Sequence, residues 1–597
     1  MTDTLECEIL HLIKEMDVAI AEDNESYLPM YVFFSGKKNL YNECGKSVLA
    51  DAAEVLAWIT HMALDAESKN TPVIAAITLR DSRSVSPEDL RPEHRAFLEK
   101  LYPKLSTGLL KSRIAEIALM LDKPRRWDLV DEILEGYLAE PLSDKSWYTY
   151  QQNLWTRAVT LSRQFRKEAS IKYIEAQIQQ YIDTHSPEHP GISFPLYNFI
   201  HDRCLLASNV DTNAANIMAF GAYEKSNNNF SLAERLFYLA SDFYKHNRNH
   251  TKQLNALFES AECLFLEAEN SVQFREKGNL IGSGLYERAL QRYRLIPAAQ
   301  RGLNGADVRI EECLKRVRVH GELSLEDMQT FQLPPTDLTE LVKFSVNHVK
   351  NKGHIFKASL YFVGFSTITA ESVQDNEKAQ FRISDLFGTV FLSGDGRAIG
   401  RAGAASSDHS RVRQMQSFDF SLKIAVAGEI MPAMHLLLQE YNFVMRFFEE
   451  LCHCSPLIPD DRVQLTARGL YLGFEYRFSE SIHMISPQIE FMVRNLLKQA
   501  NVRTSTIDEA GIENEVGLSS LLDKPEAKSL LGNDLHFNLV SLYTDPLGAN
   551  LRNYAAHGLL NDDSSQSDAV VYAWWLYYKI IVMSVTQAPL FTIPHPE

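Results

Sequence analysis

Cysteine is scarce in this chain and has no regular spacing. The 597 residues contain seven cysteines, at positions 7, 44, 204, 263, 313, 452 and 454. This scatter argues against a disulfide framework and indicates a reducing, cytoplasmic compartment. Cys452, His453 and Cys454 stand together, but no second Cys or His pair follows at zinc-site spacing. We therefore expect neither a metal nor another cofactor.

We expect neither a signal peptide nor a membrane segment. Residues 1–6 are acidic and lack the basic and apolar regions of a signal peptide. The most apolar run, residues 570–585, contains Lys579 and is shorter than the ~18–20 residues that a membrane span needs. We predict that this run forms a buried last helix and that the chain does not enter a membrane.

Positive charge is in deficit. The chain has 60 Lys and Arg residues against 77 Asp and Glu residues, which gives a formal charge of −17 and a pI near 5.6. A protein that coats nucleic acid without specificity needs a broad basic surface, so that class is excluded. A local site for RNA remains compatible with this charge.

Motifs of several large enzyme classes are absent. The sequence has no P-loop, no His-Glu-x-x-His zinc helix and no Gly-x-Ser-x-Gly elbow. Gly394, Gly396 and Gly400 are not at the spacing of a dinucleotide fold. With 45% apolar and 23% charged residues, the chain is typical of a globular protein with room for roughly three or four domains.

Helical periodicity dominates residues 1–190, the first predicted domain. Apolar residues recur at three- and four-residue spacing in 7–20 and 48–64, and Ser86 followed by Pro87 predicts a capped helix start. Residues 109–121 and 127–137 predict an antiparallel helix pair. The aromatics of 147–155 are either a stacking platform for nucleic acid or anchors of a helical core.

A helical-repeat-like region is predicted for residues 191–320. Leu232, Leu236, Leu239 and Phe243 trace one apolar helix face, and similar faces recur around Leu257 and Leu290. The pattern resembles tetratricopeptide-type helix pairs. Such an array either binds a partner along its concave face or serves as a plain helical scaffold.

The character of the sequence changes after Pro334 and Pro335. Residues 321–427 are predicted to form a mixed connector, in which the β-rich stretch 381–392 and the turn 393–396 make a small hairpin or sheet, followed by a mobile loop at 402–407.

A C-terminal helical domain, residues 428–597, completes the predicted multi-domain, mainly α fold. Two long helical stretches are expected first, the second broken near Pro487, and a polar loop region at 501–528 follows them. The helical stretches are 431–452, 465–500, 533–543, 546–560 and 568–585.

Arg552, Asn553 and His557 form a compact set of phosphate-directed groups near the C-terminus. Asn553 and His557 are four residues apart, so they project from one helix face, and Arg552 is long enough to reach back toward them. An imidazole can move a proton, and a guanidinium can hold the charge of a phosphorane. The set therefore suits RNA cleavage by the 2′-hydroxyl without a metal.

The spacing of these residues has a plainer interpretation. Arg and His side chains on a helix often satisfy neighbouring carbonyls or carboxylates. A looser pair, Arg477 and His483, is interpreted as coincidence because Phe478 stands where a polar residue would be expected. Glu490 and Arg494 share a helix face, as an ordinary i,i+4 ion pair or as a pair that orients Arg552 or contacts RNA.

Residues 482–560 resemble a bacterial and eukaryotic domain family of unknown function whose hallmark is Arg-Asn, three residues, His-Gly. Arg552, Asn553, His557 and Gly558 match all four fixed positions. That family resembles a branch of the HEPN superfamily of small helical domains, many of which are ribonucleases. The resemblance implies a HEPN-type helical bundle and an endoribonuclease that leaves 2′,3′-cyclic phosphate ends.

The resemblance also implies roles and partners. His557 would be the general base or acid, Arg552 the phosphate stabiliser and Asn553 the residue that orients either, with Glu490, Arg494 and Asn550 in secondary roles. A homodimer through the C-terminal domain would supply a second histidine. A regulatory protein or phage trigger acting through the helical N-terminal region fits a toxin-like role in anti-phage defence. The alternative is a non-catalytic scaffold or a nucleotide- or RNA-binding protein.

Overall fold

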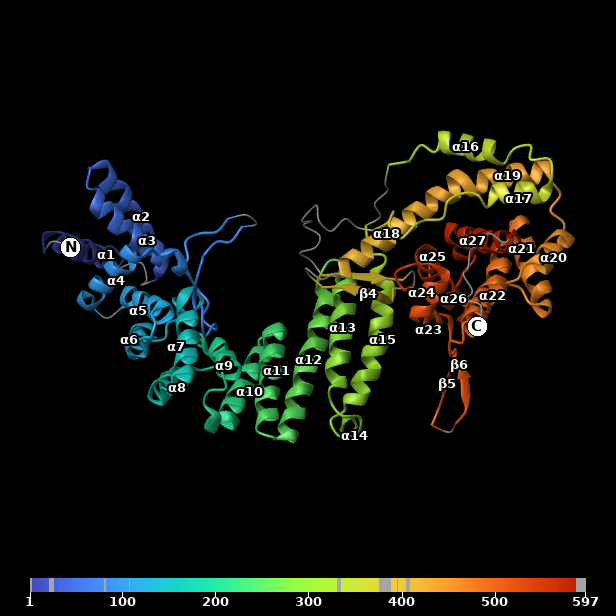
Figure 1. Ribbon diagram of the computed structural model, residues 1–597. Helices are drawn as coiled ribbons and strands as arrows, with labels where there is room; N and C mark the ends of the chain where they lie inside the picture. The colour runs from blue at the N-terminus through green and yellow to red at the C-terminus, as the bar shows by residue number, and fades with distance from the viewer. Residues whose placement is uncertain are drawn as a thin grey trace. The chain divides into compact units, whose positions relative to one another are not determined.

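The protein is mainly helical in the computed structural model (Figure 1). The structure describes residues 3–20, 26–79, 82–106, 108–329, 334–374, 388–393, 396–403, 408–509 and 511–586. Within these residues, the strands form two-stranded antiparallel sheets only. The chain separates into two compact units, Met1–Val317 and Arg318–Glu597. The finer division into four domains stays a prediction.

The first part of the first unit has one continuous apolar core, which extends from Ile9 to Ala256. Trp147 and Trp155 are buried in this core. They therefore anchor the helical core, which is the second of the two alternatives for residues 147–155. The elements are α1 (Asp3–Ile20), α2 (Tyr27–Glu43), α3 (Ser47–His61), β1 (Ala63–Leu64), β2 (Val73–Ile74), α4 (Pro92–Leu101), α5 (Leu109–Leu121), α6 (Val130–Tyr137), α7 (Gln152–Gln164), α8 (Glu168–Asp183) and α9 (Ser193–Asp202).

Helices α10 to α13 pack on one another in chain order, and α15 shares an apolar core with α12 and α13, which gives a helical-repeat-like array. Helices α10 and α11 approach closely at Gly221. A Cβ at this position would lie 2.8 Å from the ring of Phe237, so a larger residue would not fit without a shift of the ring. The tetratricopeptide likeness of this array stays a prediction. The elements are α10 (Val210–Ser226), α11 (Phe230–His246), α12 (His250–Phe274), α13 (Gly278–Arg294), α14 (Ala298–Arg301) and α15 (Ala306–Ser324).

The second unit is a helical assembly with two small hairpins. Strand β3 pairs with β4, as predicted for the connector; residues 381–387, 394, 395 and 404–407 lie outside the described residues. The elements are α16 (Thr339–Val349), α17 (Ile355–Phe362), β3 (Thr389–Leu392), β4 (Ala398–Ala402), α18 (Asp408–Ala425), α19 (Met431–Glu440), α20 (Met445–Cys454), α21 (Val463–Phe474), α22 (Phe478–Gln499), β5 (Ser505–Ile507), β6 (Glu513–Glu515), α23 (Leu518–Leu522), α24 (Pro525–Leu531), α25 (Asn533–Tyr543), α26 (Leu551–Ala556) and α27 (Asp568–Val585).

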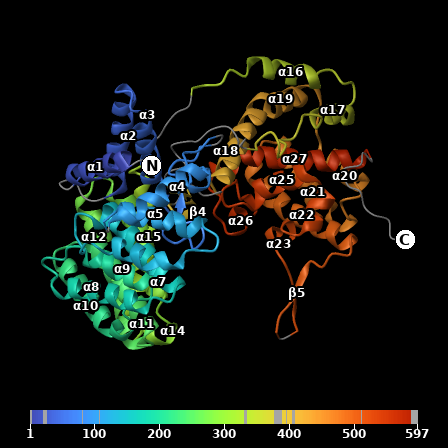
Figure 2. The same cartoon turned by 60° about the vertical axis from the view of Figure 1, so that its left-hand side comes forward.

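The last helix, α27, is the centre of the second unit, as its apolar sequence predicts. It packs against α18, α20, α21 and α22 (Figure 1 and Figure 2). Its buried indoles donate to carbonyl oxygens: Trp574 Nε1 to Leu470 at 3.0 Å and Trp575 Nε1 to Phe362 at 3.2 Å. Apolar burial and satisfied polar atoms together fix this helix in the core.

Several predicted boundaries are wrong. The long stretch 465–500 breaks at Tyr476, whose φ of 58° is left-handed, and Pro487 lies inside α22. Proline costs about 3 kcal/mol inside a helix. The apolar face of α22 continues in phase on both sides of it, through Ile485 and Ile489, so burial outweighs that cost.

Other helices are shorter, longer or divided. The start expected at Ser86 is a single 3-10 turn, Pro87–Asp89. Helix resumes at Asp408 rather than near residue 428, and the stretch 431–452 is divided between α19 and α20. Of residues 546–560, α26 alone is α-helical, because Asn550 and Gly558 adopt left-handed backbone at its two ends.

One described stretch, His409–Glu440, has the length and composition of a membrane-crossing helix. Buried helices of globular cores share this length and composition. Phe418, Leu422 and Met434 of this stretch lie in the core of the second unit. We therefore interpret it as a core helix.

Lys579 makes the stability of the second unit depend on pH. Its Nζ donates to the carbonyl oxygen of Phe365, and burial lowers its pKa from 10.5 to about 8, opposed by the charge of Glu429. The unfolded chain keeps this proton up to pH 10.5, so the burial penalty is complete below pH 8 and is relieved between pH 8 and 10.5. Relative to Lys579→Met, the wild type should gain about 1 kcal/mol of unfolding free energy per pH unit in that window.

Chemical denaturation of both proteins at several pH values measures this difference. Lys423→Met is the matched control, since Lys423 is 58% exposed and pairs with Asp419. The control should differ from wild type by an amount that does not change with pH. A pH-independent difference for Lys579→Met would contradict the depressed pKa.

Candidate functional site

The predicted site residues lie around α26, a short helix with a defined start and end. Asn550 caps it in a left-handed conformation, with φ of 48°, and Leu551 anchors it in the core. Gly558, with φ of 65°, ends it, and the amide of Leu559 donates to the Tyr554 carbonyl at 2.8 Å. His557 is consequently the C-cap residue and not part of the helix.

A chain of side-chain hydrogen bonds holds Asn553. Its Nδ2 donates to Asn550 Oδ1 at 2.7 Å, and its Oδ1 accepts from Arg552 Nη1 at 3.3 Å. Both ends of the Asn553 amide are therefore occupied. In this structure the Asn553 side chain contacts Arg552, and its contact with His557 is through the backbone, where the His557 amide donates to the Asn553 carbonyl at 3.0 Å.

Glu490 of α22 bridges two arginines. Its Oε2 accepts from Arg552 Nε at 2.9 Å, and its Oε1 accepts from Arg494 Nη2 at 2.8 Å. The side chains of Arg494, Glu490 and Arg552 are 14%, 18% and 29% exposed, so water screens these pairs only partly. Glu490 and Arg494 thus form the i,i+4 ion pair expected from the sequence, and Glu490 also binds Arg552.

Arg494 has further hydrogen-bond partners besides Glu490. Arg494 also donates to Glu515 at 2.7 Å and to the Val516 carbonyl at 2.8 Å, so it ties β6 and the following residues to α22. Arg552 Nη2 lies near Gly517, where an added Cβ would be 3.3 Å away. The absence of a side chain at Gly517 therefore leaves space for the Arg552 guanidinium.

These residues form one wall of the α22–α26 pocket, a hollow of about 410 Å³. Three guanidinium groups and a single carboxylate line it, which leaves a local surplus of positive charge within an acidic protein. The Arg462 guanidinium stacks on the Phe491 ring, 4.1 Å from its centroid. The lining residues are Arg462, His483, Ser486, Pro487, Glu490, Phe491, Arg494, Arg552, Ala555 and Ala556.

His483 is a lining residue that the sequence interpretation discarded as coincidence. Its Nδ1 lies 2.7 Å from the Ser479 carbonyl oxygen, which can only accept, so Nδ1 carries the proton. In the neutral ring, Nε2 then has a free lone pair and can take a proton. The spacing of positions 483, 490 and 494 places all three on one face of α22, and this periodicity was a usable signal. Arg462 gave no such local signal, because it precedes α21.

His557 stands apart from this set. It is exposed, and within the described residues no hydrogen bond or ion pair holds its imidazole. It follows Ala555 and Ala556, which line the pocket, but does not line the pocket itself. The structure thus joins Arg552, Asn553, Asn550, Glu490 and Arg494, and leaves His557 beside them.

Metal ligands do not gather in the described part of the chain, where no group of three or more His, Cys, Asp or Glu side chains could hold an ion. All seven cysteines are free. Cys452 is buried and Cys454 is exposed, so the two thiols of the Cys-His-Cys segment lie in different environments.

The bridge made by Glu490 predicts a measurable loss of stability when its charge is removed. Glu490→Gln keeps the shape of the side chain but removes the carboxylate partner of Arg552 and leaves Glu515 as the remaining carboxylate partner of Arg494. We expect the free energy of unfolding to fall by about 1–3 kcal/mol. Urea denaturation of the full chain measures this change.

Glu480→Gln on the same helix is the control, because Glu480 is 47% exposed in its pair with Arg477. Its loss should stay below about 1 kcal/mol. Equal losses for the two variants would show that Glu490 contributes no more than a surface ion pair.

Comparison with known proteins concerns the first unit and not this pocket. Residues 2–174 match a domain of unknown function, DUF7380. No curated protein and no solved structure matches the chain. The match therefore covers the N-terminal helices, and the interpretation of the α22–α26 pocket rests on its own geometry and on the sequence resemblance of residues 482–560.

Proposed function

We propose that the second unit is a metal-independent endoribonuclease of HEPN type, with the α22–α26 pocket as its phosphate site. The observation that carries the proposal is the fixed Arg552 guanidinium, held by Glu490 and Asn553 at the wall of a pocket that also contains Arg462, Arg494 and His483. The match of Arg552, Asn553, His557 and Gly558 to the family hallmark supports it independently.

The pocket suits a nucleic-acid backbone. A phosphodiester carries one negative charge, and the surplus guanidinium charge attracts it. The planar Arg462 guanidinium, stacked on the Phe491 ring, offers a flat surface on which a base can stack. A flexible single strand fits such a hollow better than a duplex, whose bases face inward.

The chemistry is an in-line transfer at phosphorus. The 2′-oxygen attacks the adjacent phosphorus and loses its proton to a base, while the bond to the 5′-oxygen breaks and that oxygen receives a proton from an acid. The products are a 2′,3′-cyclic phosphate and a 5′-hydroxyl. Arg552 stabilises the charge that gathers on the non-bridging oxygens.

Two histidines fit the two proton transfers. His557 follows the lining residue Ala556, and His483 lines the pocket with Nε2 free to accept. One imidazole cannot be base and acid in the same step, so His557 acts with His483 of the same chain or with the imidazole of a second copy in a homodimer. Glu490, Arg494 and Asn550 act through Arg552 and are positioning residues.

The helical first unit would regulate this activity. Uncontrolled cleavage of RNA harms the host cell, so we expect the first unit to hold the activity at a basal rate that a trigger raises. A regulatory protein or a phage component that binds the helical array would supply it in a cytoplasmic, toxin-like role in anti-phage defence.

A non-catalytic scaffold or RNA-binding protein is the second candidate, and one observation favours it. The exposed His557 imidazole is not oriented by any side chain among the described residues, whereas a working general base is normally held in place. In that case the pocket would bind a phosphate without cleaving it.

RNA cleavage in EDTA tests the proposal. We expect the purified full-length protein to cut mixed cellular RNA and to leave 2′,3′-cyclic phosphate ends. His557→Ala should lower the rate at least about 100-fold, because a general acid–base group contributes 10²–10⁴. His453→Ala removes an exposed imidazole outside the pocket and should leave the rate unchanged.

The outcome for His483→Ala distinguishes the source of the second imidazole. A loss equal to that of His557→Ala places both groups in one chain, and an unchanged rate requires the homodimer. Cleavage by His557→Ala at the wild-type rate would contradict the proposed role. RNA binding without cleavage, unchanged by His557→Ala, would favour the scaffold.

A further inference from the structure

A second charged hollow lies in the first unit, far along the chain from the residues considered above. This Arg113 cavity has a volume of about 580 Å³. It lies among the start of α2, the end of α3, α5 and the start of α7. Arg113 lines it together with the rings of Tyr27, Tyr31, His61 and Tyr150.

Arg113 is a buried cation with two unpartnered nitrogens. It is 1% exposed, and its Nε and Nη1 have no hydrogen-bond partner among the described residues. The Tyr27 ring covers one face of the guanidinium, with 3.9 Å between the Arg113 Cζ and the ring centroid. This stacked ring leaves the Nε and Nη1 donors of the guanidinium without a partner.

Glu116, a buried carboxylate on the same helix as Arg113, already has other partners. Glu116 Oε1 accepts from Arg157 Nε at 3.1 Å and from Nη2 at 2.5 Å, and Glu116 Oε2 accepts from the Tyr137 hydroxyl at 3.1 Å. Arg157 donates its remaining nitrogen to the Ser68 carbonyl. One carboxylate therefore compensates Arg157, and Arg113 is the surplus charge of this cluster.

The composition of the cavity wall fits the same conclusion. None of the residues that line the Arg113 cavity is acidic. Burying an uncompensated charge costs several kcal/mol, so such a group is retained where a counter-charge arrives from outside. A guanidinium edge binds a carboxylate or phosphate through two parallel hydrogen bonds, and the four surrounding rings offer flat apolar surfaces.

We propose that the Arg113 cavity binds a small organic anion: a carboxylate or phosphate monoester on a flat aromatic body. The anion occupies the in-plane donors of Arg113, and the body lies among the rings of Tyr27, Tyr31 and Tyr150. The volume of the cavity suits a ligand of this size. Because the cavity lies within residues 2–174, the site belongs to the part of the chain that matches the domain of unknown function.

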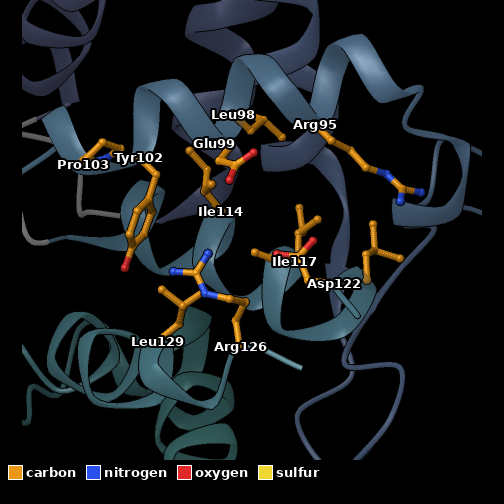
Figure 3. A pocket seen from close by; sticks show the side chains of 12 residues that line it. Arg95, Leu98, Glu99, Tyr102, Pro103, Ile114, Ile117, Asp122, Arg126 and Leu129 are labelled. Atoms are coloured by element: carbon orange, nitrogen blue, oxygen red, sulfur yellow. The ribbon is translucent and has the colours of Figure 1, made fainter. Parts of the chain in front are cut away.

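Another pocket of the first unit contains an arginine whose guanidinium is paired with a carboxylate. It has a volume of about 370 Å³, and Arg126 and Tyr102 lie at its wall (Figure 3). Arg126 is paired, since its Nε and Nη2 donate to Asp128 at 3.1 and 2.8 Å. Arg126 therefore has no need of an external anion and provides a control for the loss of one positive charge.

Calorimetric titration of the full-length protein tests the proposal with matched probes. Benzoate and adenosine monophosphate are compared with their neutral counterparts, benzyl alcohol and adenosine, and inorganic phosphate is the arm without an aromatic body. At least one aromatic anion should bind saturably below about 10 mM and at least about tenfold more tightly than its neutral counterpart. Benzoate and adenosine monophosphate distinguish a carboxylate from a phosphate ligand.

Two variants locate the binding. Arg113→Met keeps much of the side-chain volume and should abolish the preference for the anion, while Arg126→Met should bind as wild type does. Asn153 is exposed and lines the cavity, so Asn153→Trp should block it without disturbing the core. This second variant keeps the test decisive if Arg113→Met does not fold.

Three results would overturn the proposal. The first is that no aromatic anion binds saturably up to about 10 mM. The second is equal binding of the charged and neutral probes, which would leave an apolar cavity only. The third is anion binding that persists in Arg113→Met or Asn153→Trp, because it would place the site elsewhere.

Discussion

The carboxylate of Glu490 is the interaction on which the α22–α26 pocket depends. Its two oxygens bind Arg494 and Arg552, which come from different helices, and Arg494 extends the connection to the residues after β6. Without this bridge, two guanidinium groups would repel each other across a partly buried space. With it, the charge of Arg494 is engaged in the fold, and Arg552 keeps a defined position with Nη2 near Gly517.

In each unit, one carboxylate lies beside two arginines, and the two arrangements differ in their exposure to water. In the first unit, Glu116 compensates Arg157 and leaves Arg113 buried with unpartnered donors. In the second, Glu490 serves two arginines that retain some contact with water. A surplus charge in contact with water is screened, so the α22–α26 pocket can remain open without a ligand. The Arg113 cavity has less screening and therefore a stronger need for an anion.

Local sequence patterns predicted the helices that begin after a glycine or serine and continue as an apolar periodic run. Helices α5, α25 and α27 begin and end where expected, because Gly108, Gly532 and Ser567 precede strongly apolar periodic runs. Pro487 misled the prediction, since burial on both sides of it outweighs its local cost. Among the site residues, the Glu490 and Arg494 face followed from spacing, whereas their contact with Arg552 joins positions 62 residues apart and needed the fold. His483 shared that face, but its pairing with Arg477 was interpreted as coincidence because Phe478 stands where a polar residue would be expected.

The two histidines near the α22–α26 pocket differ in how far the chain prepares them. The Ser479 carbonyl fixes the tautomer and orientation of His483, so its Nε2 is ready to accept a proton. His557 is placed by backbone alone: its amide closes the last turn of α26 by donating to the Asn553 carbonyl at 3.0 Å, and its ring is left to solvent. A histidine in that state becomes an effective catalyst when something outside the described fold orients the ring. In the proposed reaction, the bound RNA or a second copy of the chain would do so, and this requirement would link cleavage to assembly on the substrate rather than to the isolated protein.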